Sequence, residues 1–373
     1  MKYYIIAGEA SGDLHGSKLI REIKKIDSNA NIRCWGGILM KKSGGVLVKD
    51  YKELAFMGFI EVLMHLKTII KNFKFCKKDI IKFNPDVIVY IDYPGFNLRI
   101  AKWAKKRGYK NHYYISPQIW AWNENRISVI KKNIDSLYAI LPFEKDYYKR
   151  KHDFKVHFVG HPLVENFKKQ KTQSNFYKKN KISNKNSLIA MLPGSRKQEI
   201  KRMLKTFIET SKKFLNFQFV LAAAPGIEIN WYKKYLHNTN IIVVKNQTYE
   251  LLKVSKAAIV SSGTATLETA IIGTPQVVCY KTNFFTYQIA KRLVKLKFIS
   301  LVNLISNKKI VEELIQKKFT VDNLSIALKK ILSEKNQNTL KKEYLKLISK
   351  LGVRSASKTT ARLIINSINQ KNN

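Results

Sequence analysis

The sequence predicts an α/β protein with two doubly wound domains that face a cleft, followed by a helical tail. Three observations support this prediction. The chain has 373 residues, more than a single compact domain usually holds. Short apolar runs alternate with longer patterned segments, which is typical of parallel strands connected by helices. The alternation occurs in two blocks, which are separated by the polar, glycine-free segment Phe167–Asn186.

The first block, residues 1–165, predicts the N-terminal domain. Its helices are expected at His15–Lys25 and Leu98–Arg107. Its strands are expected at Lys2–Ala7, Val87–Ile91, Tyr113–Ile115, Leu137–Leu141 and Val156–Val159. Because these runs are short and apolar along their whole length, we expect a parallel sheet that is covered on both faces.

The second block, residues 166–345, restarts the same alternation and predicts the second domain. From Val311 onward the pattern is helical, and we expect no further strand. We expect residues 346–373 to form a separate C-terminal helix. The strands of this block are expected at Leu188–Leu192, Phe217–Ala222, Ile241–Val244, Ala257–Val260 and Gln276–Tyr280.

The charge of the chain points to an anionic partner or to a general enrichment in lysine. The formal net charge is +43 and the pI is about 10.0. Basic surfaces attract nucleic acid and anionic membranes. The lysines are dispersed over every predicted helix, and no RRM, KH, zinc-finger or helix-turn-helix signature is present. We therefore favour a lysine-rich composition, then attraction to an anionic membrane, and we expect no nucleic-acid partner.

The cysteines and the hydropathy pattern limit the class of protein further. Cys34, Cys76 and Cys279 stand singly without C-x-x-C spacing, which predicts a reducing compartment and no structural zinc. No apolar run approaches the ~18 residues of a membrane-spanning helix. The chain enters a strand pattern at once, so we expect no signal peptide.

The segment Ser261–Glu268, SSGTATLE, is the most informative motif. It follows the apolar run Ala257–Val260, a predicted buried strand, and leads into a helix expected over Thr266–Ile272. Small residues let a ligand approach the backbone closely, and a helix N-terminus attracts an anion. One turn into the helix, Glu268 can accept hydrogen bonds from a ribose diol. The motif suits a nucleotide diphosphate; an ordinary turn with a solvated Glu268 is the alternative.

Two loops of the first block follow predicted strands and carry polar side chains. Ligands in open α/β sheets bind beyond the carboxyl ends of the strands. The loop Ala7–Asp13 (AGEASGD) adds the side chains of Glu9, Asp13 and, just beyond it, His15. Asp92 directly follows a strand, and burial there would raise its pKa and make it a usable base. Capping of a helix over Asn97–Lys106 is the alternative role of Asp92.

A further loop predicts a diphosphate clamp in the second block. Leu192–Arg196 (LPGSR) follows the first strand of that block. Backbone amides at Gly194 and Ser195, together with the Arg196 guanidinium, are suited to bind phosphate oxygens. Capping of the following helix by Glu199, three residues beyond the loop, is the alternative.

Two apolar segments suit an acylated ligand. Ser116–Trp122 (SPQIWAW) places two tryptophans in a loop after a strand, and Met57–Leu63 (MGFIEVL) lies near the start of a helix. His161, in a Gly-His-Pro sequence at the domain junction, is expected to be structural. No G-x-S-x-G, H-E-x-x-H or Walker motif is present, which disfavours hydrolases, metalloproteases and P-loop enzymes.

These motifs together resemble the lipid-A-disaccharide synthases, which are inverting glycosyltransferases with two Rossmann-like domains (the GT-B type). The chain departs from the family pattern at Ile38 and Val302, where the family often carries proline. The matching stretches span most of the chain in the family's order: AGEASGD at Ala7–Asp13, DYPGFNLRIAK at Asp92–Lys102, YYISPQIWAW at Tyr113–Trp122, LPFE at Leu141–Glu144, FVGHPL at Phe158–Leu163, LPGSR at Leu192–Arg196 and SGTATLE at Ser262–Glu268.

The resemblance implies a reaction. UDP-2,3-diacylglucosamine donates its sugar to the 6-hydroxyl of 2,3-diacylglucosamine 1-phosphate (lipid X), which yields the β-1,6-linked lipid A disaccharide 1-phosphate and UDP. Asp92 is the expected base. The expected nucleotide site consists of Gly194, Ser195, Arg196, Gly263, Thr264, Ala265, Thr266 and Glu268. The expected acceptor side consists of Ser11, Gly12, Asp13, Asn97, Trp120 and Trp122.

The resemblance also implies partners and a location. We expect no cofactor and no metal, since no D-x-D motif stands in a loop on the nucleotide side. We expect a cytoplasmic enzyme that is peripheral on the anionic cytoplasmic face of the inner membrane. The C-terminal segment is expected to pack back on the first domain. The sequence leaves a homo-oligomer open.

Two other functions fit parts of the sequence. A UDP-sugar epimerase has the same architecture, but it has no acceptor and would not need the aromatic loop. A basic membrane-binding protein without catalysis would explain the charge, but it would leave Asp92, Arg196 and Glu268 at strand ends without a role.

Overall fold

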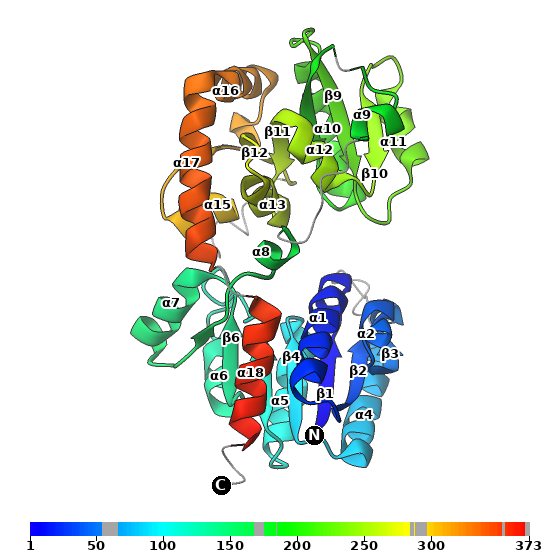
Figure 1. Cartoon of the computed structure of the whole chain (residues 1–373), viewed down its shortest axis with the longest axis vertical. Helices are drawn as coiled ribbons and strands as arrows, with labels where there is room; N and C mark the ends of the chain where they lie inside the picture. The colour runs from blue at the N-terminus through cyan, green and yellow to red at the C-terminus, as the bar shows by residue number, and fades with distance from the viewer. Residues whose placement is uncertain are drawn as a thin grey trace. The chain divides into compact units, whose positions relative to one another are not determined.

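The protein folds into two α/β units. The computed structural model describes residues 1–53, 66–167, 175–183, 185–283, 287, 297–352 and 355–369. The first unit comprises Met1–Glu165 and Leu351–Asn373, and the second comprises Asn166–Lys350 (Figure 1). The chain therefore leaves the first unit once and returns to it at its end.

The first unit is built on a seven-stranded parallel sheet with the order β3-β2-β1-β4-β5-β6-β7. Its central strands are apolar and fully buried, as expected for a sheet that is covered on both faces. The strands are β1 (Lys2–Ala7), β2 (Asn31–Gly36), β3 (Val46–Asp50), β4 (Val87–Ile91), β5 (Asn111–Tyr114), β6 (Ser136–Ala139) and β7 (His157–Phe158).

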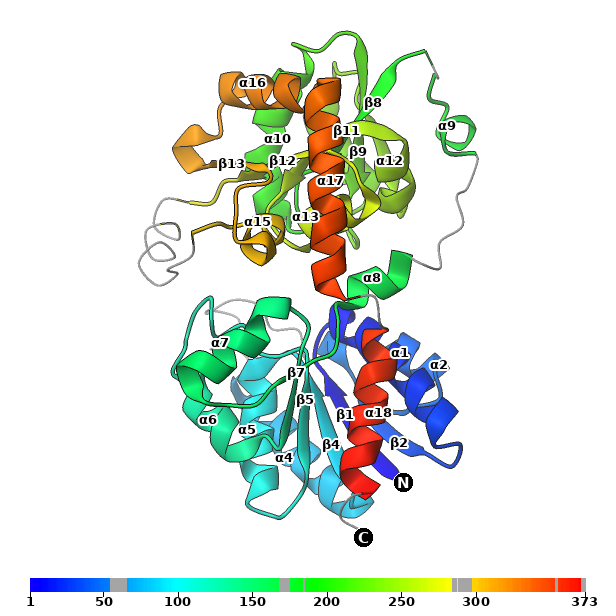
Figure 2. The same cartoon turned by 60° about the vertical axis from the view of Figure 1, so that its left-hand side comes forward.

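Helices cover both faces of this sheet. On one face α1 and the C-terminal helix α18 lie side by side (Figure 2) and share one apolar core with the strands. The opposite face is covered by α4, α5, α6 and α7 around a second core. The helices are α1 (Ala10–Ile26), α2 (Ile38–Lys42), η1 (Tyr51–Glu53), α4 (Leu66–Phe83), α5 (Pro94–Lys105), α6 (Arg126–Asn133), α7 (Pro142–His152), α8 (Pro162–Phe167) and α18 (Ala356–Asn369).

The second unit has a six-stranded parallel sheet with the order β10-β9-β8-β11-β12-β13. Its strands are β8 (Ser187–Leu192), β9 (Phe217–Ala223), β10 (Ile242–Lys245), β11 (Ser255–Ser261), β12 (Gln276–Tyr280) and β13 (Glu312–Ile315). Its helices are α9 (Phe176–Lys179), α10 (Lys197–Ser211), α11 (Ile229–Leu236), α12 (Thr248–Val254), α13 (Thr264–Ile272), α15 (Leu301–Ser306), η2 (Gln316–Lys318), α16 (Val321–Leu332) and α17 (Glu334–Leu351).

The expected fold class is confirmed, but three strands lie outside the predicted ranges: β2 and β3 in the first unit and β13 in the second. The sequence pattern led us to expect no strand after Val311, but β13 pairs with β12 as the edge strand of the second sheet. β13 begins with two consecutive glutamates, and carboxylate residues are depleted in strands, so the sequence pattern did not predict a strand here. Contacts with a distant segment stabilise Glu313 in the strand: its carboxylate accepts hydrogen bonds from the amide of Ile299 (3.0 Å) and the hydroxyl of Ser300 (2.7 Å).

Both sheets reverse their strand order at an equivalent place. The reversal lies between β1 and β4 in the first unit and between β8 and β11 in the second. Loops that leave two such strands turn to opposite faces of the sheet and leave a crevice between them, where ligands of this fold class bind. The loops after β1, β4, β8 and β11 are therefore the ones that can build a site.

Candidate active site

The crevice of the second unit holds most of the predicted nucleotide-binding residues. Leu192, the last residue of β8, pairs with Val260 of β11, so the LPGSR and SSGTATLE loops leave neighbouring strands. The two loops line a cavity of about 440 Å³. Its lining includes the predicted residues Gly194, Ser195, Gly263, Thr264, Ala265 and Glu268.

Two glycines shape the backbone of this cavity. Gly194 has φ +121° and Gly263 has φ +152°, conformations that side-chain-bearing residues rarely adopt. A Cβ on Gly194 would also lie 3.2 Å from Oε2 of Glu199. Gly263 directly precedes α13 and, as a glycine, has no side chain to cap that helix. The Thr266 amide donates to the carbonyl of Gly263 over 3.2 Å, whereas within the described residues the amides of Thr264 and Ala265 have no partner and are open to an anion in the cavity.

Glu268 lies on the first turns of α13 and is held by a residue that the sequence reasoning missed. The hydroxyl of Tyr249 donates to Oε1 of Glu268 over 3.0 Å. Burial raises the pKa of Glu268, and this hydrogen bond partly opposes the rise. Tyr249 lines the same cavity from the start of α12. The signal available in the sequence was the run Asn246–Tyr249 at the end of a predicted strand.

Two predicted residues of this site do not line the cavity. Arg196 is exposed, and its Nη1 lies 3.6 Å from Oε1 of Glu199 in a weak ion pair. Thr266 is fully buried, and its hydroxyl donates to the carbonyl of Gly263 over 2.8 Å. Thr266 thus shapes the first turn of α13, whereas Arg196 lies beside the cavity with an exposed side chain that is held only by this weak ion pair.

In the first unit, Asp92 sits in strained backbone at the end of β4. Asp92 has φ +46° and Tyr93 has φ +49°, two consecutive left-handed residues that are not glycine. The carbonyl of Asp92 accepts hydrogen bonds from Nδ2 of Asn97 (2.7 Å) and from the hydroxyl of Tyr113 (2.5 Å). Such strain persists only where neighbours enforce it, and it is concentrated at functional sites.

The environment of the Asp92 carboxyl fits a base. Burial raises its pKa to about 6, and the negative charge of Glu9 adds to the rise. The alternative role, a cap for the following helix, does not match the geometry: α5 begins at Pro94, and its N-cap position is held by Tyr93 and not by Asp92. A carboxyl whose pKa lies near neutrality can take a proton and release it again.

The other predicted residues of this crevice divide into exposed and structural ones. Ser11 is exposed on the first turn of α1, whereas Gly12 is buried against Ala7. The buried carboxylate of Asp13 accepts hydrogen bonds from the amides of Gly37 (2.8 Å), Leu39 (3.2 Å) and Met40 (3.0 Å). Asp13 therefore holds the N-terminus of α2, as Asn97 holds the Asp92 turn.

The loops after β1 and β4 contact each other where the ring of Tyr93 packs against the backbone of Gly8. A Cβ on Gly8 would lie 2.3 Å from Cδ1 of Tyr93, so the Tyr93 ring occupies the space that any side chain at Gly8 would need. The contact explains why a glycine stands at this point of the AGEASGD loop. It also fixes the second left-handed residue of the Asp92 turn.

The tryptophan loop is anchored by a buried glutamate that the sequence reasoning did not single out. Glu144 accepts hydrogen bonds from Oγ of Ser116 (2.6 Å), Nε1 of Trp120 (3.1 Å) and the amide of Leu141 (2.9 Å). Burial raises the pKa of Glu144 to about 7, and these bonds oppose the rise. Trp120 is therefore partly structural, whereas Trp122 is 51% exposed. The LPFE stretch was the signal for Glu144.

The two histidines near these loops differ in exposure: His161 is buried, whereas His15 is half-buried. Burial lowers the pKa of His15 to about 4 and that of His161 to about 3. Nδ1 of His161 accepts a hydrogen bond from the amide of Leu163 over 3.2 Å. This local bond agrees with a structural role for His161.

The expectations about the second apolar segment, membrane-spanning helices and metal sites can be compared only with the described residues. Met57–Leu63, the second apolar segment, lies outside the described residues. Within the described ranges, no helix is long and apolar enough to cross a membrane. The same part of the chain contains no group of histidine, cysteine and carboxylate side chains arranged to hold a metal ion.

Sequence comparison identifies relatives over the whole chain. A family model described as "Lipid-A-disaccharide synthetase" matches residues 3–365. A "Lipid-A-disaccharide synthase" from Trichlorobacter lovleyi is 35% identical over 98% of this chain and 97% of its own length. A "Lipid-A-disaccharide synthase 1" from Legionella pneumophila strain Paris is 36% identical over 99% and 98%.

Structural comparison supports the GT-B fold. The glycosyltransferase of kitacinnamycin biosynthesis superposes with a TM-score of 0.70 at 13% identity, covering 98% of this chain and 99% of that one. The UDP-GlcNAc 2-epimerase of Neisseria meningitidis superposes with a TM-score of 0.67 at 13% identity, covering 98% and 100%. Likeness at this identity concerns the fold alone, whereas the sequence relatives carry the activity. The chain therefore belongs to the lipid-A-disaccharide synthase family and is a glycosyltransferase of lipid A biosynthesis.

Proposed function

We propose that the protein transfers the sugar of UDP-2,3-diacylglucosamine to the 6-hydroxyl of lipid X, with Asp92 as the base and the second-unit cavity as the donor site. The observation that carries this proposal is the Asp92 carboxyl, which has a raised pKa in strained backbone at a strand-order reversal. The equivalent reversal in the other unit carries open amides suited to a diphosphate.

The donor would be held by its UDP group. The amides of Gly194, Ser195 and the first turn of α13 would bind the diphosphate, because unpaired N–H groups and the helix dipole stabilise negative charge. Glu268, oriented by Tyr249, would accept hydrogen bonds from the ribose hydroxyls. Arg196 would leave its weak pair with Glu199 and add positive charge as the leaving group forms.

The acceptor would be activated at Asp92. The 6-hydroxyl is a poor nucleophile, so a base must take its proton as the new C1–O6 bond forms and the bond from C1 to the UDP oxygen breaks. One displacement of this kind inverts the anomeric centre and gives the β-1,6 linkage. Asp92 receives the proton, and UDP leaves with the electron pair of the broken bond.

The lipid substrates suggest a peripheral enzyme on the anionic cytoplasmic face of the inner membrane. Trp122 is exposed, and the Arg126 guanidinium lies 5.0 Å from the centre of its ring, a combination that suits an interface of acyl chains and phosphates. The protein should sediment with anionic vesicles but not with neutral ones, and salt should release it. Equal sedimentation with both would leave the charge of +43 as a property of composition.

One incubation tests the proposed reaction directly. The protein is mixed with UDP-2,3-diacylglucosamine and lipid X, and the products are separated by mass. We expect UDP and disaccharide 1-phosphate in equal amounts, and neither without lipid X. An isomerised UDP-sugar that forms without acceptor would instead indicate the epimerase activity.

A further inference from the structure

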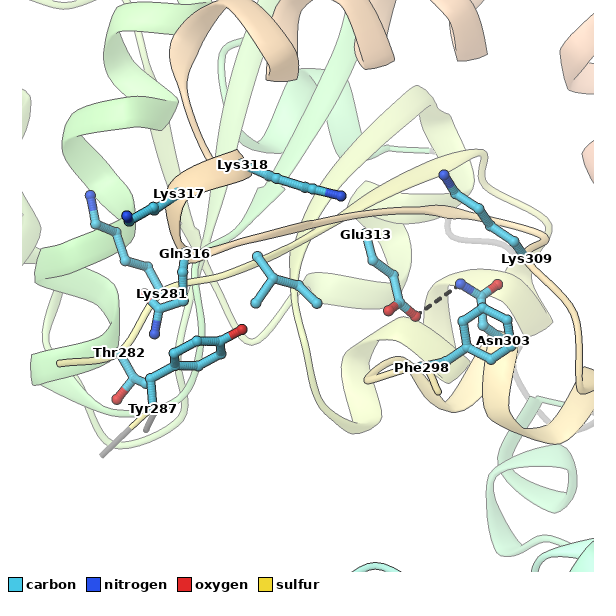
Figure 3. Close-up of a pocket in the computed structure, with 11 residues that line it drawn as sticks. Lys281, Thr282, Tyr287, Phe298, Asn303, Lys309, Glu313, Gln316, Lys317 and Lys318 are labelled. Atoms are coloured by element: carbon cyan, nitrogen blue, oxygen red, sulfur yellow. Dashed lines mark hydrogen bonds between the residues drawn. The ribbon is translucent and has the colours of Figure 1, made fainter. Parts of the chain in front are cut away.

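A second cavity lies on the same sheet edge as the nucleotide cavity. The nucleotide cavity is lined from the carboxyl ends of β8, β9, β10 and β11. The second cavity, of about 800 Å³, begins where the neighbouring strands β12 and β13 end (Figure 3). Tyr280 pairs with Ile315, so the segments that follow these two strands run beside each other. A cavity of this size is in the range of ligand pockets, roughly 300–1,000 Å³.

The two cavities are connected through one loop. Ser262 lines the nucleotide cavity, and its hydroxyl donates to the carbonyl of Ile299 over 3.0 Å. Ile299 directly follows Phe298, which lines the second cavity. One hydrogen bond thus joins a residue of the nucleotide cavity to the neighbour of a residue that lines the second cavity.

The second cavity has an excess of positive charge, since four lysines and one glutamate line it. Lys281, Lys317 and Lys318 line it and have no ion-pair partner among the described residues. Its one carboxylate, Glu313, is engaged: it accepts hydrogen bonds from the amide of Ser300 (3.0 Å) and from Nδ2 of Asn303 (2.8 Å), the latter drawn in Figure 3. The lining therefore favours a negatively charged ligand over a neutral or positive one.

The same cavity offers an unsatisfied donor and an apolar surface. Nε2 of Gln316 is buried and has no hydrogen-bond partner in the described structure, and the residue has φ +51°. A buried amide without a partner is costly, so an acceptor atom of a ligand would relieve it. Phe298, Ile315 and the ring of Tyr287 supply apolar lining. The cavity therefore offers lysine charge and an amide donor to an anionic head group, and apolar surface to an acyl chain. A ligand that has both parts is an anionic amphiphile.

We propose that this cavity, which we call the lysine pocket, binds an anionic amphiphile: a phosphate head at Lys281, Lys317 and Lys318, with an acyl chain against Phe298 and Ile315. The phosphate could come from an acylated sugar phosphate of the enzyme's own reaction or from a bulk phospholipid. The pocket does not depend on the role given to Asp92, so it can be tested separately from catalysis.

Binding of dodecyl phosphate tests the proposal. The protein is first saturated with UDP, so that the nucleotide cavity is filled, and dodecyl phosphate is titrated below its micelle concentration in a calorimeter. We expect binding, with inorganic phosphate and neutral dodecyl maltoside each weaker by about tenfold or more, because each lacks one half of the interaction. Absence of dodecyl phosphate binding to the UDP-saturated protein would overturn the proposal.

Matched double variants locate the site. Lys317→Ala/Lys318→Ala should weaken dodecyl phosphate binding by roughly tenfold or more, since a hydrogen bond to a charged group contributes at least that factor. Lys341→Ala/Lys342→Ala removes the same charge from an exposed pair on α17 and should leave binding unchanged. Equal weakening in both variants would show a general charge effect and refute the pocket. UDP affinity is measured in both, so a defect of the nucleotide cavity is seen separately.

Competition distinguishes the two sources of the ligand. Both competitors are titrated against dodecyl phosphate on the UDP-saturated wild-type protein, and displacement by neither would overturn the proposal. Displacement of dodecyl phosphate by 2,3-diacylglucosamine 1-phosphate, and not by monomeric short-chain phosphatidylglycerol, assigns the pocket to the reaction's own lipids. Equal displacement by both assigns it to membrane phospholipid.

Discussion

The two units share a strand order but carry different chemistry where that order reverses. In the first unit the reversal places a carboxyl, Asp92, in left-handed backbone whose carbonyl is held by Asn97 and Tyr113. In the second unit it places two glycines with positive φ, Gly194 ahead of α10 and Gly263 ahead of α13. One scaffold thus prepares a proton acceptor in one unit and an anion site in the other. The different chemistry of the two units therefore comes from the loops that follow the strands, and not from the sheets, whose strand order is the same.

The comparison predicts that the largest loss of rate comes from the proton acceptor. Asp92→Asn keeps size and hydrogen bonding but removes basicity, so kcat should fall by ~10²–10⁴. Calorimetry should show UDP affinity near normal, because the nucleotide cavity belongs to the other unit. Asp153→Asn is the matched control, since Asp153 is also a left-handed aspartate of the first unit but is exposed. Nearly full turnover of Asp92→Asn would move the base to Glu9 or His15.

The next largest effect is expected at the leaving group. Arg196→Ala should reduce kcat/KM for the donor by ~10²–10³, because a charge that meets the developing diphosphate is lost. The KM for lipid X should stay unchanged. Arg202→Ala, farther along α10, is the control. A normal kcat and a normal donor KM in Arg196→Ala would contradict this role. Arg196 would then stay outside the nucleotide cavity during the reaction, as it does in this structure.

A smaller effect is expected for ribose binding. Glu268→Ala should weaken UDP binding by ~10–100-fold, since a hydrogen bond to a carboxylate contributes about 1.5–3 kcal/mol. Tyr249→Phe should weaken it by only about 2–10-fold, because it removes a neutral donor that orients Glu268. Isothermal titration of UDP measures both. An unaltered affinity in Glu268→Ala would exclude the ribose contact.

The pH dependence should follow the proton acceptor and not the anion site. A base works only when deprotonated, and the pKa of Asp92 is about 6. Below that pH, kcat/KM should therefore fall by about tenfold per pH unit. Glu144, whose pKa is about 7, is the competing source of such a decline. We expect kcat/KM of Glu144→Gln to fall with decreasing pH as in the unmodified protein. If the fall is absent in Glu144→Gln, then Glu144, and not Asp92, is the group whose protonation lowers the rate.

The smallest effect is expected from chelation. Amides, a helix N-terminus and Arg196 already oppose the diphosphate charge in this proposal, so EDTA should leave the rate nearly unchanged. The rate is measured before and after EDTA, and again with added magnesium. Activity that EDTA abolishes and magnesium restores would show that the second unit needs a metal to stabilise its anion.

The sequence was informative wherever the signal is local. Apolar runs predicted most strands of both sheets, and motifs at strand ends predicted the residues that line the nucleotide cavity. The contacts that position those residues join distant parts of the chain and were not predicted. Tyr249 reaches Glu268, and Glu144 reaches Trp120. The strand β13 was missed for the same reason, since Glu313 is explained only by its partners near Ser300.

The two departures from the family pattern also become understandable in the structure. Ile38 is the first residue of α2, and Val302 is the second residue of α15. Both positions lie in the first turn of a helix, where proline is well tolerated because the amide has no intrahelical partner. Replacing proline there by another residue keeps the helix start, so these loops retain their form.

The return of α18 to the first unit has a consequence for how the protein is made. Ala356, Ala361 and Ile364 belong to the same apolar core as Leu19 and Ile20, although a whole unit separates them in the chain. On the ribosome, the N-terminal sheet emerges first, yet one of its faces stays uncovered until the last segment has been translated. The second unit is continuous in sequence, so it can complete its fold earlier. The nascent chain therefore carries an unfinished apolar face through most of its synthesis, and that interval is when it most needs protection from aggregation.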